Sequence, residues 1–210
     1  GTGYFYPDGG QGLPTEIEHT YPDYNLYPDL CRDIAYGFLT RGCPRGCEFC
    51  IVKKKEGQYS RKVADLQKFW RGQKNIVLLD PNMFACPDWK ELSQQIIDSC
   101  AGANFSQGCD IRIMTEEKAE YIKRMKIKQI HFAWDRYEDK EKIVPRFKAF
   151  KDITGWDKRK LPVYVLCNVD TTHEQDLERI YTLRDLGYWP YVLIFEKDKL
   201  LKQHITSSPT

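Results

Sequence analysis

The chain has 210 residues and a formal net charge of +2 at pH 7, with 41% hydrophobic and 30% charged residues. This balance is typical of a globular protein with one core and excludes an intrinsically disordered chain. No run of about 18 apolar residues occurs, which excludes a membrane-spanning helix. The small net charge leaves a nucleic-acid partner open, and the basic runs VKKK and DKRK are interpreted as solvated faces.

Residues 1–33 are predicted to form an irregular N-terminal segment rich in Tyr and Pro. The chain begins with Gly1 rather than Met, so we expect an earlier segment to precede it in the full protein. Proline presets φ and aspartate bonds its own backbone, so each Tyr-Pro-Asp triplet predicts a turn. The triplets begin at Tyr6, Tyr21 and Tyr27. Residues 199–210 are predicted to form a tail.

Between residues 34 and 198, apolar runs of the buried-strand type alternate with segments of helical periodicity. The predicted strands are 33–39, 75–80, 103–114 with its loop, 129–135, 161–170 and 191–196. The predicted helices are 60–72, 88–100, 115–126, 140–153 and 172–187. This alternation favours parallel βαβ units with right-handed crossovers, and therefore an α/β fold.

Four of the predicted helices carry recognisable start signals. Ser60 is expected to cap the first of them, and Thr115 opens the third. Asp88 with Glu91, and Thr172 with Gln175, have the spacing of a capping box, in which two side chains bond each other's backbone. These signals set the predicted helix starts.

Two architectures fit parallel strands with helices outside them: an open, doubly wound sheet and an incomplete barrel. In both, ligands bind beyond the carboxyl ends of the strands. Polar or aromatic side chains recur at these ends, and they are Asp80, Asn82, Gln107, Asp110, Trp134, Asp135, Asn168 and Asp170. We therefore expect the functional site at this edge of the sheet.

The stretch FLTRGCPRGCEFC places Cys43, Cys47 and Cys50 on one loop directly after the first predicted strand. A structural zinc site takes four ligands, usually as two separated pairs, and no second pair stands at matching spacing. Thiolates suit iron–sulfur clusters, and three of them can hold three irons of a four-iron cube and leave the fourth open. The remaining cysteines are expected to be reduced and to pack as small buried hydrophobes, and these are Cys31, Cys86, Cys100, Cys109 and Cys167.

The cysteine spacing, with Phe49 before the last cysteine, resembles the signature of radical S-adenosylmethionine (SAM) enzymes. That family places the signature after the first strand of a βα barrel, so the resemblance implies a partial (βα)6 barrel with parallel strands over residues 34–198. It also implies that Cys43, Cys47 and Cys50 ligate a [4Fe-4S] cluster whose open iron binds SAM. Such enzymes take an electron from a donor such as flavodoxin or ferredoxin, cleave SAM and abstract a hydrogen atom from a substrate. An oxygen-sensitive cluster implies a cytoplasmic location.

The resemblance further implies a set of SAM contacts at the strand ends. The family's Gly-Gly-Glu-like stretch after the second strand is replaced here by LLDPNMF, where we expect Asp80 or a backbone carbonyl to contact the SAM amino group. Arg112 suits the methionine carboxylate. The residues implied for SAM binding are Phe49, Asp80, Pro81, Asn82, Gln107, Asp110 and Arg112. The alternative for the polar ones is a strand-end hydrogen bond or a surface ion pair, and Arg41 and Arg45 either tune the charge of the loop or are solvated.

Asp135, Asn168 and Asp170 are expected to ring the mouth of the barrel with Trp134. Carboxylates and an aromatic face suit a guanine-like base, whose N–H groups a carboxylate can accept. The alternative is that Trp134 belongs to the core and the acids cap loops, and His131 is interpreted as a core or supporting histidine. The stretches EIEHTYPDYNLYP, AYGFLTRGCPR, FWRGQ and YTLRDLGYWPYV resemble small radical SAM proteins associated with queuine lyase activity. This implies a small-molecule 7-deazaguanine substrate and the release of 7-aminomethyl-7-deazaguanine.

Two other functions stay open. The first is a radical SAM enzyme that modifies RNA or a peptide, although a methylthiotransferase would need a second cysteine triplet, which these residues lack. The second is an iron–sulfur electron carrier without chemistry of its own, which saturates its cluster with four ligands. Cys31, twelve residues before Cys43, is then the candidate fourth ligand.

Overall fold

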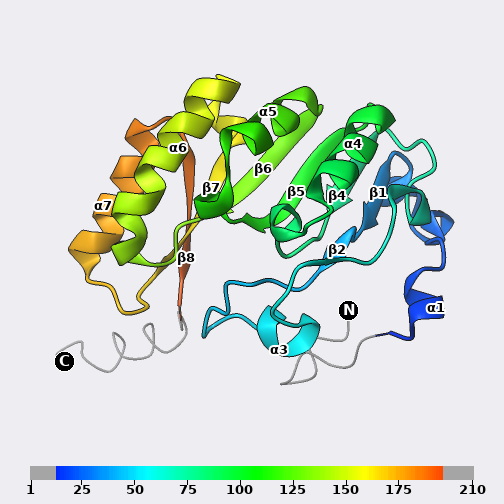
Figure 1. Ribbon diagram of the computed structural model, residues 1–210, viewed down its shortest axis with the longest axis horizontal. Coiled ribbons are helices and arrows are strands. Elements are labelled where there is room, and N and C mark those ends of the chain that lie inside the picture. Colours follow the sequence, from blue (N-terminus) through cyan, green and yellow to red (C-terminus); the bar gives the residue numbers. More distant parts are fainter. Residues whose placement is uncertain (1–12, 196–210) are drawn as a thin grey trace, which may run out of the picture.

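Six strands form one parallel sheet in the computed structural model, which describes residues 13–195 (Figure 1). They are β1 (Ile34–Gly37), β4 (Asn75–Leu78), β5 (Gly102–Cys109), β6 (Ile127–Ala133), β7 (Pro162–Cys167) and β8 (Trp189–Ile194). A separate antiparallel ribbon consists of β2 (Thr40–Arg41) and β3 (Arg61–Lys62). All six strands predicted for the sheet are confirmed, with boundaries that differ from the predicted ones.

The α-helices of the described chain are α1 (Thr15–Glu18), α2 (Pro28–Cys31), α3 (Val52–Glu56), α4 (Trp89–Ser99), α5 (Glu116–Arg124), α6 (Lys140–Thr154) and α7 (His173–Asp185). Short 3-10 turns include η2 (Leu66–Lys68) and η5 (Tyr137–Asp139). Helices α4 to α7 each connect two neighbouring strands of the sheet, and they confirm the last four predicted helices. None of the helices in residues 13–195 is long and apolar enough to cross a membrane.

The strand order separates the two architectures that the sequence left open. The order is β1-β4-β5-β6-β7-β8, so every strand lies next to the one that precedes it in this sheet along the chain. A doubly wound sheet reverses direction at a switch point, and no such reversal occurs in this sheet. The sheet is therefore singly wound, as in a βα barrel, and it stays open because β1 and β8 do not pair with each other. This arrangement is compatible with a partial barrel.

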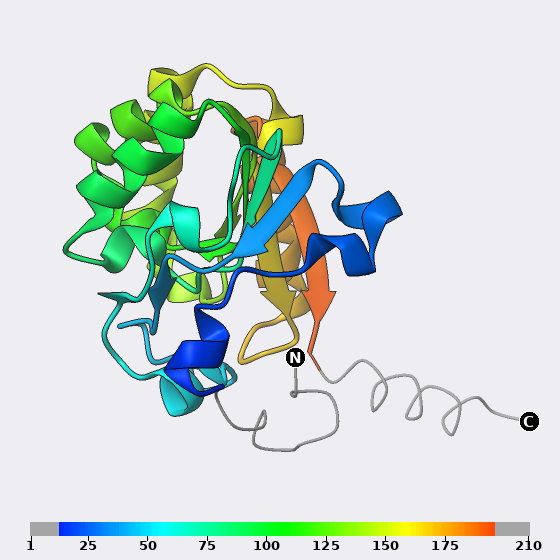
Figure 2. The ribbon, with the colours of Figure 1, turned by 90° about the vertical axis from the view of Figure 1, so that its right-hand side faces the viewer.

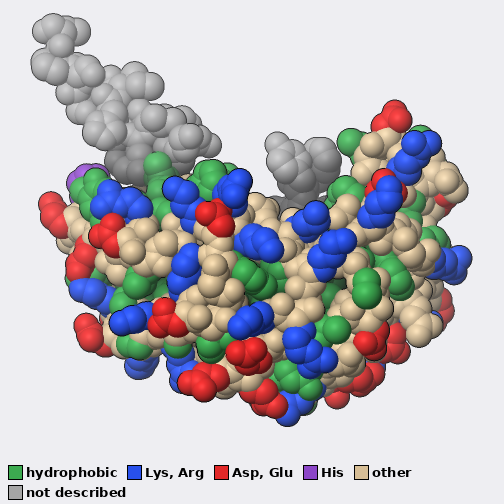
Figure 3. Space-filling view, turned by 90° about the horizontal axis from the view of Figure 1, so that it is seen from above, with side chains coloured by type: hydrophobic (Ala, Val, Ile, Leu, Met, Phe, Trp, Pro, Cys, Tyr) green, Lys and Arg blue, Asp and Glu red, His purple; other side chains and the backbone are tan. Residues whose placement is uncertain are grey.

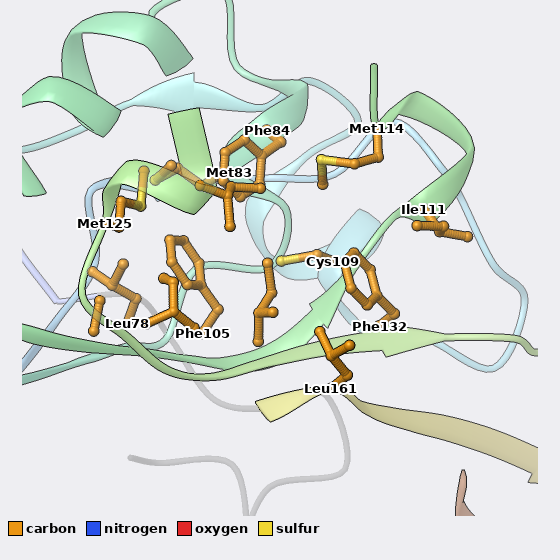
Figure 4. Packing of buried hydrophobic residues seen from close by; sticks show 14 of the residues in the cluster. Leu78, Met83, Phe84, Phe105, Cys109, Ile111, Met114, Met125, Phe132 and Leu161 are labelled. Carbon is orange, nitrogen blue, oxygen red and sulfur yellow. The ribbon is translucent and has the colours of Figure 1, made fainter. Parts of the chain in front are cut away.

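The crossover helices cover one face of the sheet, and residues 13–195 place no helix layer on the other face. Figure 2 shows α4 to α6 stacked on one side of the strands. The core lies between these layers (Figure 4): Phe84 meets Phe105 of β5 at a centroid distance of 5.5 Å, and Phe132 of β6 meets Phe147 and Phe150 of α6 at 5.9 and 5.0 Å. Side chains that alternate with these along the strands therefore lie on the helix-free face.

The helix predicted for residues 60–72 is wrong. This segment forms β3 and η2 instead, with an extended backbone between them. Ser60 does not cap a helix, because its hydroxyl donates to the Asn82 carbonyl at 3.0 Å. Leu66 and Phe69 gave the segment its helical spacing, and both are buried, Leu66 from the short 3-10 turn η2 and Phe69 from the residue that follows it. Burial of the same side chains is thus achieved without the helix.

Three smaller predictions have different outcomes. Thr172 and Gln175 form the predicted capping box at the start of α7. The capping box predicted at Asp88 is wrong, because that side chain makes no cap hydrogen bond and lies 3.7 Å from the Cys86 thiol. Cys86, Cys109 and Cys167 are buried as predicted, whereas Cys100 is exposed at the left-handed end of α4 and Cys31 is half-buried. The turn predicted at Tyr6 lies outside the described residues.

Strand β5 carries an irregularity where it pairs with β6. The register shifts between Phe105 and Cys109, so part of the regular ladder is lost there. Side chains of the neighbouring strands bond the carbonyls of β5 in this region. His131 Nδ1 bonds the Phe105 carbonyl at 2.8 Å, and the Tyr164 hydroxyl donates to the Ser106 carbonyl at 3.0 Å. The irregularity therefore fixes two aromatic side chains on the helix-free face.

Candidate thiol site at the strand ends

The three clustered cysteines lie on the connection between β2 and β3, just beyond the carboxyl end of β1. Gly42 opens this connection with a φ of +86°, a conformation that favours glycine. A Cβ at this position would lie 2.2 Å from the Tyr59 carbonyl oxygen, so the close approach of the two chain segments also requires glycine. The Cys43 amide donates to the Gly57 carbonyl at 3.2 Å. The cysteine loop, residues 42–59, is thereby closed at its base.

Cys43, Cys47 and Cys50 are half-buried free thiols. Burial raises the pKa of Cys47, and the neighbouring Arg45 guanidinium opposes that shift. Within residues 13–195, no three Cys, His, Asp or Glu side chains converge on a single ion. A four-iron cluster does not need such convergence, because each thiolate binds a different iron. Three soft sulfur donors on one loop thus fit such a cluster better than a lone hard cation.

Asn82 lies against the cysteine loop. Its Nδ2 donates to Cys43 Sγ at 3.6 Å. The residue is 1% exposed, yet its Oδ1 has no hydrogen-bond partner among the described residues. A buried acceptor without a donor is costly, so such atoms call for a ligand or a water. The Asn82 side chain therefore bonds a thiol through its Nδ2 and offers its free Oδ1 as an acceptor for an N–H group of a ligand.

Asp80 turns its carboxylate toward the end of β1. It accepts hydrogen bonds from the amides of Leu39 (3.1 Å) and Thr40 (2.5 Å) and from the Thr40 hydroxyl (2.6 Å). Burial raises the pKa of Asp80 to about 6, although these hydrogen bonds oppose the shift. The carboxylate thereby fixes the direction in which the chain leaves β1 and enters the cysteine loop. The contact of Asp80 to SAM stays a prediction.

A row of alternating charges joins the cysteine loop to β5 and β6. Arg45 of the loop lies 3.3 Å from Asp135 and 3.9 Å from Asp139. Asp139 lies 3.3 Å from Arg112, which in turn binds Asp110 through two hydrogen bonds of 2.9 Å. The Arg45 side chain is 12% exposed, so the alternative that it is solvated is wrong. We call these five residues the charge row.

The charge row brings together three of the residues that the sequence pointed to, Asp110, Arg112 and Asp135. Burial raises the pKa of Asp135, and the guanidinium groups of Arg45, Arg179 and Arg112 counter this effect only in part. The Asp110 carboxylate raises the pKa of Arg112. In this arrangement the guanidinium of Arg112 is occupied by protein carboxylates, so a ligand carboxylate would have to replace one of them.

Sequence reasoning missed Arg179 of α7, whose side chain is 0% exposed. Its guanidinium donates to the carbonyls of Trp134 (2.7 Å), Asp135 (3.1 Å) and Leu166 (2.9 Å), and to the Asp176 carboxylate (2.5 Å). It therefore ties the carboxyl ends of β6 and β7 to α7. The sequence signal, an Asp and an Arg three residues apart on a helix, is more typical of an exposed ion pair.

The loop after β7 is less closely connected to the cysteine loop. Asn168 and Asp170 are exposed and have positive φ values of 65° and 50°. The backbone N–H of Asn168 donates to the Asp176 carboxylate, which is the ion-pair partner of Arg179. Trp134 is 1% exposed and packs on the core, so the prediction that it rings the mouth is wrong and the alternative core position is confirmed.

The remaining predicted SAM contacts lie in different surroundings. Phe49 is 41% exposed and lines a cavity of about 810 Å³ on the cysteine loop, together with Cys47, Cys50 and Lys53. Pro81 is half-buried between Asp80 and Asn82, and Gln107 is exposed, with its amide 3.5 Å from the Ser106 hydroxyl. The structure does not bring Gln107 into the charge row.

The fold and the site define an α/β protein with a singly wound parallel sheet and a thiol loop at the end of its first strand. Comparison with protein-family models and with curated proteins finds no match for the sequence. Function therefore has to be argued from the geometry of the site and from the resemblance of its cysteine spacing.

Proposed function

We propose that this protein is a radical SAM enzyme whose sheet is the partial (βα)6 barrel of that family. The observation that carries the proposal is the position of the cysteine loop. It follows the first strand of an open, singly wound parallel sheet, at the edge where such folds bind ligands. The charge row holds the loop down on the ends of β5 and β6. Location in the cytoplasm is part of this proposal.

The chain's own residues would hold and orient the cofactors. Cys43, Cys47 and Cys50 would ligate a [4Fe-4S] cluster, which when bound supplies the electron that cleaves SAM. The Asn82 amide hydrogen-bonds Cys43 Sγ, and its free Oδ1 is available to an N–H group of SAM. Phe49 offers an exposed ring for adenine on the same loop. Flavodoxin or ferredoxin is the kind of donor proposed.

The electron-carrier alternative needs a fourth cysteine near the loop, and the position of Cys31 does not support it. Cys31 ends α2 just before β1 begins, whereas Cys43 follows the other end of that strand. Cys31 also lines a separate cavity of about 650 Å³ with Tyr21, Tyr24 and Gln73. A site with three thiolates and an open position is the arrangement that supports catalysis.

For the substrate, we propose a 7-deazaguanine base, with queuine lyase activity that releases 7-aminomethyl-7-deazaguanine. Asp135, Asn168 and Asp170 would bind the base from the ends of β6 and β7. Figure 3 views the molecule from above, from the side opposite α3 in Figure 1, and shows Lys and Arg interspersed with Asp and Glu there, without a basic stripe. The small-molecule substrate is proposed from the carboxylates at the strand ends, and an RNA substrate stays the alternative.

Anaerobic reconstitution tests the proposal. The wild-type protein should retain about four irons per chain, change its EPR spectrum when SAM is added, and form 5′-deoxyadenosine. Replacing Cys43, Cys47 and Cys50 together with Ala should abolish all three signals, and Cys100→Ala, at an exposed thiol outside the loop, should not. An iron-loaded protein whose spectrum ignores SAM, and which cleaves none, would refute the proposal. Equal 5′-deoxyadenosine formation with and without queuine would refute the substrate only.

A further inference from the structure

The helix-free face of the sheet carries a row of three aromatic rings across β6, β7 and β8. His131 and Tyr164 stack with ring centroids 5.1 Å apart and an interplanar angle of 16°. Tyr191 of the edge strand meets Tyr164 edge-on at 5.7 Å and is 54% exposed. Ile130 and Phe132, on either side of His131, are buried on the helix side, so the imidazole lies on the other face. We call these three rings the aromatic row.

The aromatic row is held in place by the irregularity in β5. A carbonyl oxygen only accepts, so the contact between His131 and the Phe105 carbonyl requires the hydrogen on Nδ1. Burial lowers the pKa of His131, which favours the neutral ring. Nε2 is then an acceptor, and it has no hydrogen-bond partner among residues 13–195. Tyr164 is fixed in turn by its bond to the Ser106 carbonyl.

A second unsatisfied acceptor lies on the same face. Ala103 and Phe105 of β5 are buried against the helices, so Asn104 between them turns its side chain to the helix-free face. Its Oδ1 is buried and has no partner within the described chain. Further along β5, Gly108 lets the neighbouring strands approach closely, because a Cβ there would lie 3.2 Å from Ala133 Cβ and 3.7 Å from the Tyr164 ring. Two acceptors without donors and a rigid aromatic surface thus occur together.

We propose that the aromatic row is the binding surface for a planar heteroaromatic ring that carries N–H donors, such as a purine or deazapurine base. The ring stacks on the row and donates an N–H to His131 Nε2. The inference rests on the proposed function only in taking this ring to be part of the substrate. It adds stacking on His131, Tyr164 and Tyr191 to the contacts proposed above for Asp135, Asn168 and Asp170.

The test is calorimetric titration of the reconstituted full chain with 7-aminomethyl-7-deazaguanine, without SAM or reductant. Stacking on an aromatic side chain is lost on truncation to Ala, so Tyr191→Ala should weaken binding about tenfold or more. His131→Gln keeps a donor for the Phe105 carbonyl and should weaken binding to a similar extent. Tyr181→Ala is the matched control, because that tyrosine is 49% exposed on α7 and stacks with Arg184, away from the row. Its affinity should equal that of the wild type.

Two results would overturn the inference. The first is wild-type affinity in both Tyr191→Ala and His131→Gln, with circular dichroism showing that the variants are folded. The second is no binding of the base by the wild type. This includes the case in which a second copy of the chain covers the aromatic row, so that Tyr191→Ala dissociates a dimer. SAM cleavage and the EPR response are measured separately, so either result would leave the proposed radical SAM chemistry standing. The second result would also count against the proposed 7-deazaguanine substrate.

Discussion

Replacement of Arg179 by Met tests how the site edge of the sheet is held. The substitution removes a guanidinium that is 0% exposed and keeps a side chain of similar length. It removes the donor to the carbonyls of Trp134, Asp135 and Leu166 and the cationic partner of the Asp176 carboxylate, which keeps its bonds from Asn168 N–H and the Thr171 hydroxyl. Breaking a buried ion pair by removal of one partner costs about 3–5 kcal/mol. That is a large part of the roughly 5–15 kcal/mol by which a typical domain is stable.

Urea unfolding followed by circular dichroism measures this loss. Arg179→Met should lower the midpoint with little change in the m-value, since the area exposed on unfolding stays nearly the same. The control is Arg184→Met on the same helix, where the side chain is 62% exposed and pairs with Asp185. Exposed pairs contribute at most about 1 kcal/mol, so the control should unfold nearly as the wild type does. A loss below about 1 kcal/mol in Arg179→Met would refute the reasoning.

Three further predictions concern the cysteine loop. Arg45→Gln cuts the loop from the charge row, so anaerobically reconstituted protein should retain less iron than the control Lys74→Gln, which breaks an exposed ion pair with Asp33 outside the loop. Equal iron contents would contradict this. Gly42→Ala and Gly72→Ala both place a side chain at a positive φ, but only the Cβ at position 42 would meet a backbone oxygen, at 2.2 Å. Gly42→Ala should therefore lower the free energy of unfolding in urea by about 1–3 kcal/mol more than Gly72→Ala does. Equal losses in the two variants would count against the contact. Burial raises the pKa of Asp80 from 3.8 to about 6, so between these pH values the folded state binds a proton that the unfolded state has lost. The free energy of unfolding should therefore fall by up to about 3 kcal/mol as pH rises from 4 to 6. This decrease should be missing in Asp80→Asn, and a wild-type slope in that variant would show that another group titrates.

The sheet could be predicted from the sequence because each strand is a short apolar run and each of the last four helices has its own periodicity. The segment 60–72 shows the limit of such reasoning. Leu66 and Phe69 have helical spacing, but the ribbon of β2 and β3 and the bond from Ser60 to the Asn82 carbonyl stabilise an extended path. Spacing reports which side chains are buried and does not by itself report the backbone that buries them.

The candidate site could be predicted in part. Cys43, Cys47 and Cys50 are close in sequence, so their shared loop is visible without a structure. The charge row is not, because Arg45 and Asp135 are 90 residues apart and meet only when the sheet has formed. The role of His131 depends in the same way on a change of register in β5, for which the sequence has no clear signal.

The consecutive order of the strands has a consequence for the way in which the chain assembles. Each new strand needs only the one before it, so the sheet can grow from β1 as the polypeptide emerges during synthesis. The thiols appear early on this path, yet Asp135 and Asp139, which hold their loop, come after β6. Until that later part has folded, Arg45 lacks these carboxylate partners. The proposed metal centre would therefore gain its full surroundings only after residues made long after Cys43, Cys47 and Cys50 have arrived.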